Sequence, residues 1–286
     1  MEDLLRPIYQ ERASEPNTLG IIAVTKKELD IPITNNFDTV LLLVVQEQSE
    51  NVFVKQYQVG QEKAIMYSIS IDTMVDSLTY STNKKVFEWI HYGKIIFDRN
   101  ETLTALKERF LEYPKDRREL KMNIEYAKLI KRYKNGKVLF EQGNYLDAYN
   151  SIIHSLHHLA RLAIIEKGFH PEVTVWKQVK TIDAQIYKLY EELVFSSEGL
   201  NERLELLFLA SDFLIYSKLK TCLKHFFDIL SQQELWSVTE IYNHPDIYPY
   251  SIDLDTLLEY LIEKKVLHFE LERTKNEKVY KLLYKI

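Results

Sequence analysis

The run Thr39-Val-Leu-Leu-Leu-Val-Val45 decides the fold of the first third of the chain. A strand that is apolar at nearly every position is typical of the centre of a sheet that is covered on both faces. Neighbouring runs predict further strands over residues 19–24, 52–59, 64–71 and 93–98. Helical patterns cover residues 3–12, the segment after Asp72 and residues 101–111, the last with Asn100 as its cap. We therefore predict an α+β domain with one mixed sheet over residues 1–117.

The next part of the chain, residues 118–230, predicts helices only. Asn144 precedes a long periodic segment that ends at Gly168, and Pro171 follows, so start and stop signals come in the expected order. Further helical segments over residues 120–140, 176–193 and 200–230, the last a long helix or a broken pair, complete an up-and-down bundle. Residues 231–286 predict helix, turn, helix and hairpin, which is the order of a winged-helix module.

Composition limits the classes of protein to consider. The chain has 286 residues, 46% apolar and 28% charged, with a net charge of −5, which disfavours long disorder and a main role in coating nucleic acid. Its one cysteine, Cys222, excludes a disulfide framework within the chain and a cysteine-rich zinc site. The acidic start and the absence of an apolar run of about 20 residues predict a cytoplasmic protein without a membrane partner.

One face of the helix predicted over residues 144–167 carries polar chemistry. At about 100° per residue, His154, His158 and Arg161 fall on the same side, where they could hydrogen-bond a phosphate or a base. His154 and His158 also have the i, i+4 spacing of two metal ligands, but no third ligand is placed near them. A solvated or interdomain face is the alternative.

A basic segment lies between residues 107 and 137, with eleven basic and five acidic side chains. Lys128 and Arg132 share one helical face there with Lys121 and Glu125. Such a face could bind a phosphate or a nucleic-acid backbone. A solvated helix surface is an equally good interpretation of the same residues.

The predicted winged helix does not have the charge of a DNA-binding module. From residue 231 on there are ten acidic and seven basic side chains, and Asp253, Asp255, Glu259 and Glu263 lie on the candidate recognition helix. Because an acidic helix is repelled by the phosphate-lined groove, we expect no DNA contact. We expect this module to pair with another protein or with the rest of its own chain.

Common catalytic signatures are absent from the sequence: there is no G-x-x-x-x-G-K-[ST] loop, G-x-S-x-G elbow or H-E-x-x-H pair. Several longer stretches instead carry a family resemblance over nearly the whole chain. They are residues 5–13, 17–20, 93–100, 145–150, 157–163 and 166–173. Together with the order of the domains, they resemble the YgxA-type nucleotidyltransferase-like proteins, in which a nucleotidyltransferase-like domain precedes a helical substrate-binding-like bundle and a winged helix.

The wider nucleotidyltransferase superfamily implies a catalytic set that this chain matches only in part. That set is a Gly-Ser turn that approaches the phosphates and clustered carboxylates, an Asp-x-Asp pair and a third acid, that hold Mg²⁺. Here Gly20 is followed by Ile21, and the pair reads Asp38-Thr-Val40, so one hydroxyl and one carboxylate are missing. Asp72 could supply the third acid, so Asp38 and Asp72 are candidates for a weak Mg²⁺ site. Ordinary strand-end or cap residues are the alternative.

These observations favour a catalytically degenerate nucleotidyltransferase-like protein that binds a nucleotide or a phosphorylated small molecule. The resemblance implies a cleft between the first domain and the bundle, with Gly20 and the faces of Lys128, Arg132, His154, His158 and Arg161 as candidates for phosphate contact. One alternative is an active enzyme that adenylylates a small molecule, RNA or protein from an atypical metal site. Another is a regulatory protein that contacts protein through the winged helix or RNA through residues 107–137.

Overall fold

The computed structural model describes residues 2–26, 33–48, 53–80, 83–110, 115–275 and 278–286. Their contacts form two compact units. The first comprises Met1–Pro114 with the short segment Glu172–Thr174, and the second comprises Lys115–Pro171 and Val175–Ile286. Among the helices of the described residues, none is long and apolar enough to cross a membrane.

The first unit is built on a five-stranded mixed sheet, as the sequence predicts. Only β2 and β4 run parallel to each other, and every other neighbouring pair is antiparallel. In spatial order the strands are β3 (Phe53–Val59), β4 (Glu62–Ser70), β2 (Thr39–Val45), β1 (Thr18–Thr25) and β5 (Lys94–Asp98). Val52, which the prediction included in a strand, lies outside the described residues.

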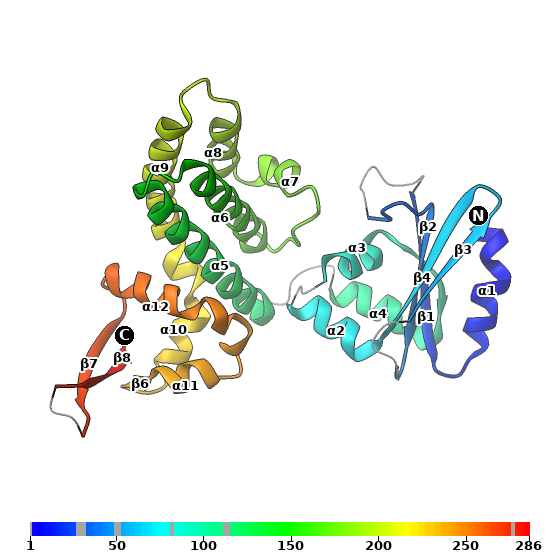
Figure 1. Ribbon diagram of the computed structural model, residues 1–286. Coiled ribbons are helices and arrows are strands. Elements are labelled where there is room, and N and C mark those ends of the chain that lie inside the picture. The colour runs from blue at the N-terminus through cyan, green and yellow to red at the C-terminus, as the bar shows by residue number, and fades with distance from the viewer. Residues whose placement is uncertain (1, 27–32, 49–52, 81–82, 111–114, 276–277) are drawn as a thin grey trace. The chain divides into compact units, whose positions relative to one another are not determined.

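The central strand β2 is buried along its whole length, which confirms its predicted place under cover on both faces. Val40, Leu42 and Val44 belong to the core on the face of three helices, whereas Leu41 packs with Leu5 of α1 on the other face. Figure 1 shows this layering. The helices are α1 (Glu2–Ser14) on one face and α2 (Ile71–Tyr80), α3 (Lys84–Tyr92) and α4 (Thr102–Arg109) on the other.

The start of α4 differs from the sequence prediction. Asn100, the expected cap, lies in the short 3₁₀ turn Arg99–Glu101 with a left-handed backbone (φ 55°). The capping carboxylate is that of Asp98, which accepts hydrogen bonds from the backbone N–H of Leu103 and of Thr104, both at 2.9 Å. Asp98 is therefore the cap residue, and the prediction for Asn100 is wrong because the chain makes one more turn first.

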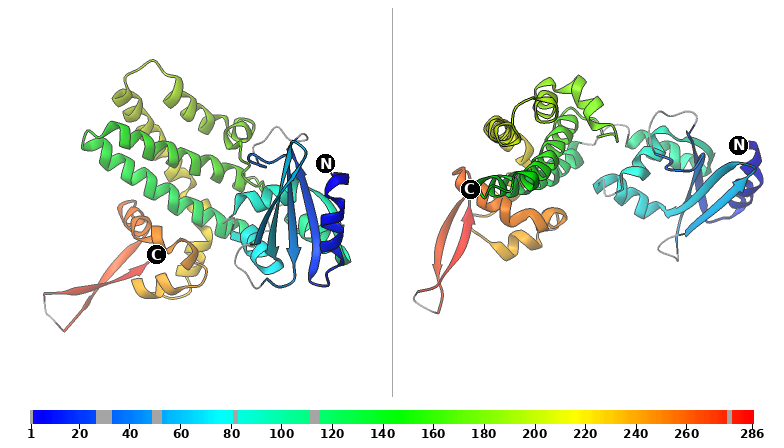
Figure 2. Two further views of the ribbon diagram at one scale, coloured as in Figure 1. Left: turned by 45° about the vertical axis from the view of Figure 1, so that its right-hand side comes forward. Right: turned by 45° about the horizontal axis from the view of Figure 1, so that its top comes forward.

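The second unit begins with a helical bundle. The long helices α5 and α6 run side by side as a hairpin (Figure 2). Gly168, with φ +88°, follows the end of α6, as the stop signal predicts. The predicted segment over residues 200–230 is a broken pair, divided at Leu223. The helices are α5 (Lys115–Glu141), α6 (Tyr145–Glu166), α7 (Val175–Ile182), α8 (Ala184–Phe195), α9 (Leu200–Cys222) and α10 (Lys224–Leu230).

The winged helix belongs to the same unit as the bundle. Its three-stranded sheet has the order β6-β8-β7, and α5 packs against both α12 and the 3₁₀ helix η3. Its elements are β6 (Trp236–Ser237), α11 (Val238–Asn243), η3 (Tyr248–Asp253), α12 (Leu254–Glu263), β7 (His268–Arg273) and β8 (Tyr280–Lys285). The predicted helix, turn, helix and hairpin are confirmed, and the module packs on its own chain.

Candidate functional site: a buried carboxylate among cations

The α5–α6 hairpin brings residues that are distant in sequence into one polar cluster. Close packing along the hairpin is possible because Gly136 has no side chain: a Cβ there would lie 3.2 Å from the Cβ of Ser151. Farther along the hairpin, the hydroxyl of Ser155 donates a hydrogen bond to the carbonyl oxygen of Leu129, at an oxygen–oxygen distance of 3.5 Å. This antiparallel register places Glu125 of α5 beside the last turns of α6.

Glu125 is the centre of this cluster. Its Oε2 is 2.8 Å from Nδ1 of His158, and its Oε1 is 3.0 Å from a terminal nitrogen of Arg161 and 3.3 Å from Nζ of Lys121. The Glu125 side chain is 1% exposed and that of Lys121 is 2% exposed. We call these four residues the Glu125 cluster.

Burial and charge act in opposite directions on the two most buried members. Burial by itself would raise the pKa of Glu125, but the hydrogen bond with His158 and the charges of Arg161 and Lys121 outweigh it and lower that pKa. Burial lowers the pKa of Lys121 to about 8, although Glu125 opposes this shift. Both groups are therefore predominantly charged at neutral pH.

Several cations surround Glu125. Its carboxylate pairs with Lys121 and Arg161, and the charges of Arg161 and Lys128 lower the pKa of Lys121 further. Nε of the buried Arg161 has no hydrogen-bond partner among the described residues. An acceptor oxygen of a second anion, such as a phosphate, would satisfy this guanidinium N–H.

The structure brings together some of the predicted site residues. His158 and Arg161 meet at Glu125, and Lys128, half-buried, acts on the same cluster through its charge. His154 and Arg132 are exposed, one helical turn away from His158 and from Lys128 respectively. In the described part of the chain, no group of three histidine, cysteine or acidic side chains could hold a metal ion, so the spacing of His154 and His158 gains no third ligand.

The structure separates Gly20 from the candidate acids of the first unit. Because β1 and β2 are antiparallel, Gly20 pairs with Val44 at one end of the strands, whereas Asp38 lies just before Thr39 at the other end. The six residue steps from Val44 to Asp38 span about 20 Å at about 3.4 Å per residue. Gly20 and Asp38 therefore lie at opposite ends of the strands.

Asp38 and Asp72 are also far apart. In the parallel pair of β2 and β4, Thr39 is level with Ala64 and Val45 with Ser70. Asp38 therefore precedes β2 at one end of the strands, and Asp72 follows β4 at the opposite end. About 20 Å of strand lies between them, so they cannot hold the same Mg²⁺. Oδ2 of Asp38 accepts a hydrogen bond from the backbone N–H of Lys63 at 2.9 Å, and Asp72 is exposed in the first turn of α2.

Gly20 has a packing reason to be glycine. A Cβ at this position would lie 2.3 Å from Cδ1 of Leu103 and 3.1 Å from the carbonyl oxygen of Phe97. The absence of a side chain thus lets α4 approach β1 closely.

The basic segment and the acidic module contact each other. Nζ of Lys131 on α5 is 2.9 Å from Oδ1 of Asp253, and Lys134 pairs with Glu263 at the other end of α12. Two cations of the segment over residues 107–137 therefore hold the winged helix on the bundle. This agrees with the expectation that the module pairs with its own chain, and it leaves fewer free cations for RNA.

Sequence reasoning did not find two features near the cluster. Glu125 was assigned to a helix face without any sign that it is buried, because the burial arises only from the partner helix. The rings of Trp176 and Tyr190 stack at 3.8 Å with an interplanar angle of 11°, and His157 meets Trp176 edge-on. The only signal in the sequence is that aromatic residues are numerous (12%), which does not pair them.

Comparison with known proteins agrees with this division of the chain. Residues 1–118 match a family model described as nucleotidyltransferase-like, residues 119–218 match the YgxA-like substrate binding domain, and residues 224–286 match a helix-turn-helix domain. All four residues of the Glu125 cluster fall within the second of these matches.

Two relatives are similar over their full lengths. The uncharacterized protein YgxA of Bacillus subtilis (strain 168) is 44% identical, with 98% of this chain and 95% of that protein covered. A crystal structure of a nucleotidyltransferase-like protein from Exiguobacterium sibiricum 255-15 has a TM-score of 0.81 at 35% identity, covering 100% of this chain and 99% of that one. The expected resemblance is confirmed: the chain belongs to the YgxA family of nucleotidyltransferase-like proteins.

Proposed function

We propose that this protein binds a nucleotide or another phosphorylated small molecule at the Glu125 cluster and does not transfer a nucleotidyl group. The single observation that carries the proposal is the unsatisfied Nε of the buried Arg161 beside Glu125. A buried guanidinium N–H without an acceptor costs free energy, which an oxygen of an anionic ligand recovers when it binds. The phosphate oxygens of such a ligand are strong acceptors for the guanidinium of Arg161.

The surroundings of the cluster support a ligand of this kind. His158 and Arg161 are 18% and 10% exposed, so a ligand can reach them from solvent, and the half-buried Lys128 lies one turn from Glu125 on the same helix face. Trp176, which stacks on Tyr190, contacts His157, the residue before His158, and offers an aromatic surface for a base.

The first unit supports the second half of the proposal. Nucleotidyl transfer with two Mg²⁺ ions needs carboxylates that gather within a few ångströms of the ions. Asp38 and Asp72 lie at opposite edges of the sheet, and the position of the second acid of an Asp-x-Asp pair is the buried Val40. The alternatives of an active adenylylating enzyme and of a protein or RNA adaptor therefore rank below binding without transfer.

Calorimetric titration with ATP, GTP, CTP, UTP and inorganic triphosphate, each with and without Mg²⁺, tests the binding. We expect at least one of these ligands to bind with a dissociation constant below about 1 mM. Lys128→Ala should weaken binding about fivefold, because one charge-assisted contact is lost. Lys188→Ala, an exposed lysine of α8 in the same unit, is the matched control and should have no effect. No binding of any of these ligands, or equal weakening by both variants, contradicts the proposal.

Incubation with nucleotides labelled at the α-phosphate tests the absence of transfer separately. We expect no label on the protein, on RNA or on a small-molecule acceptor. Label transfer that disappears in Asp38→Ala would establish the active-enzyme alternative, whereas the binding result would stand.

A further inference from the structure

Helix α9 carries an apolar stripe on its outer face, in addition to the buried face that packs in the bundle. Leu206, Leu209, Phe213 and Tyr216 are 63%, 68%, 74% and 49% exposed. The opposite side of the helix is buried, for example at Ser211 and Ile215. A helix that is apolar on both sides is suited to pack against a second layer.

The stripe is symmetric about one position. Leu206 and Leu209 lie five and two residues before Ser211, and Phe213 and Tyr216 lie two and five residues after it. At about 100° per residue, all four side chains lie within about 40° of the line opposite Ser211. A two-fold axis at the level of residue 211 therefore superposes the stripe on itself with the helix direction reversed.

The charges at the two ends of the stripe follow the same symmetry. Glu202 lies nine residues before Ser211 and Lys220 nine residues after it, both exposed and both on the line opposite Ser211. When two copies of α9 lie antiparallel, each Glu202 faces Lys220 of the other copy. A parallel pair would place like charges opposite each other, which is unfavourable.

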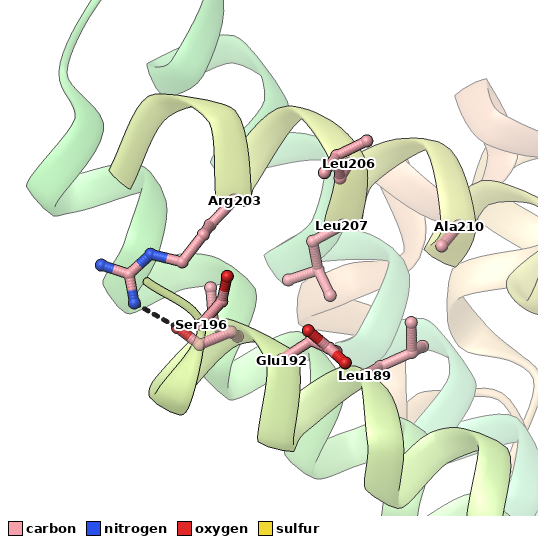
Figure 3. Close-up of a pocket in the computed structure, with 8 residues that line it drawn as sticks. Leu189, Glu192, Ser196, Arg203, Leu206, Leu207 and Ala210 are labelled. Carbon is pink, nitrogen blue, oxygen red and sulfur yellow. Dashed lines mark hydrogen bonds between the residues drawn. The ribbon is translucent and has the colours of Figure 1, made fainter. Parts of the chain in front are cut away.

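Two grooves flank the stripe. One, of about 250 Å³, lies between α8 and α9 and is lined by Leu189, Leu206 and Ala210 (Figure 3). The other, of about 200 Å³, lies between α9 and α5 and is lined by Phe140, Phe208 and Leu209. A ridge of side chains between two grooves is a surface suited to helix packing, because the ridge on one helix fits into a groove on the other.

We propose that the outer face of α9 is the interface of a two-fold symmetric homodimer, in which two α9 helices lie antiparallel with Glu202 of each opposite Lys220 of the other. Leu206 then faces Tyr216, and Leu209 faces Phe213. A second copy is the occupant that fits, since only a partner with the same spacing and the reversed order of charges matches both the stripe and its ends. Such self-complementarity is the rule in isologous dimers.

Light scattering of the full chain after size exclusion, over about 1 to 100 μM, tests this proposal. We expect twice the mass of the chain for the wild type and the single mass for Phe213→Glu, with at least a 30-fold weaker dimer. Ile252→Glu places the same charge at an 82% exposed residue of η3 and should leave the dimer unchanged. Circular dichroism verifies that both variants are folded.

Charge exchange tests the orientation. Glu202→Lys and Lys220→Glu should each weaken the dimer about tenfold, because each change breaks two symmetric pairs, and the double variant should recover the wild-type affinity. A monomeric wild type at 100 μM overturns the proposal, as does a dimer that survives Phe213→Glu. Failure of the double variant to recover would overturn the antiparallel arrangement.

Discussion

Each unit buries a glutamate on a helix, Glu88 on α3 and Glu125 on α5, yet the two carboxyls have opposite pKa shifts. Burial is the largest influence on Glu88 and raises its pKa to about 7, since the charges of Lys84 and Lys85 offset only part of it. Around Glu125, a histidine and two cations in direct contact overcome the same effect. The first unit therefore holds a glutamate that takes up a proton near neutral pH, and the second holds a glutamate that stays ionised.

This difference identifies the unit in which an anionic ligand is expected. The first unit places its other candidate acids, Asp38 and Asp72, at opposite ends of its strands. The second unit brings charged side chains from two helices together at Glu125.

The largest effect is expected for Glu125→Gln. Removing this charge breaks the buried ion pairs of Lys121 and Arg161 with Glu125, which costs about 3–5 kcal/mol of unfolding free energy. Urea denaturation measures the loss, and hydrogen exchange assigns it to the second unit. Glu141→Gln, at the exposed end of the same helix, should change stability by less than about 0.5 kcal/mol. A loss below about 1 kcal/mol for Glu125→Gln would mean that the cluster is already neutralised in another way.

The pH dependence of the two units should run in opposite directions. The pKa of Glu125 is lowered by folding, so its contribution is present above pH 4.5 and is lost as the pH falls through the folded value. The pKa of Glu88 is raised by folding, so its contribution is present below pH 4.5 and is lost as the pH rises through about 7. This effect is smaller than that of Glu125→Gln, since protonation of Glu125 stays incomplete well below pH 4.5.

Hydrogen exchange of each unit between pH 3.5 and 8 measures both slopes. Glu88→Gln should flatten the dependence of the first unit and leave that of the second unchanged. Parallel slopes in the two units would contradict the difference between the two glutamates.

A moderate effect is expected for Gly20→Ala. The added Cβ overlaps the side chain of Leu103, so we expect a loss of about 1–3 kcal/mol in the first unit. The loss should be smaller in a Leu103→Ala background, where space is available, and a double-mutant cycle measures this coupling. Nucleotide binding should stay unchanged in the single variant. Weakened binding without a loss of stability would instead favour a phosphate contact at Gly20.

The smallest effect is expected for Lys131→Ala. Its partner Asp253 is 9% exposed, so loss of the pair should cost about 1 kcal/mol and loosen the winged helix. Lys224→Ala removes ion pairs with Asp228 and Glu119 at a lysine that is more than half exposed, and it should cost less than Lys131→Ala. Thermal unfolding measures both. Equal costs would show that burial of Asp253 does not matter.

The sequence predicts what depends on local pattern. The all-apolar β2 and the ends of α6 at Asn144 and Gly168 were evident from neighbouring residues. Strand register and helix pairing were not, because they depend on contacts between distant segments. Asp38 and Asp72 therefore appeared to form one site, and Glu125 appeared to lie on a solvated face.

The family resemblance has the same limit. It correctly indicates the domain order, because the domains follow one another in the sequence. It also suggested Gly20 for phosphate contact, and the antiparallel register of β1 and β2 separates this residue from Asp38. Register is thus the information that a motif comparison lacks.

Helix α5 has one further consequence. With 27 residues it is about 40 Å long, and it contacts two other parts of the unit. Glu125 pairs with residues of α6, while Lys131 and Lys134 form ion pairs with the winged helix. A chain that ends after residue 223 would lack α10, η3 and α12, which pack against α5. We therefore do not expect the bundle to fold well alone. For the same reason, any strain that an occupied cluster places on α5 would reach the C-terminal module directly, without a hinge.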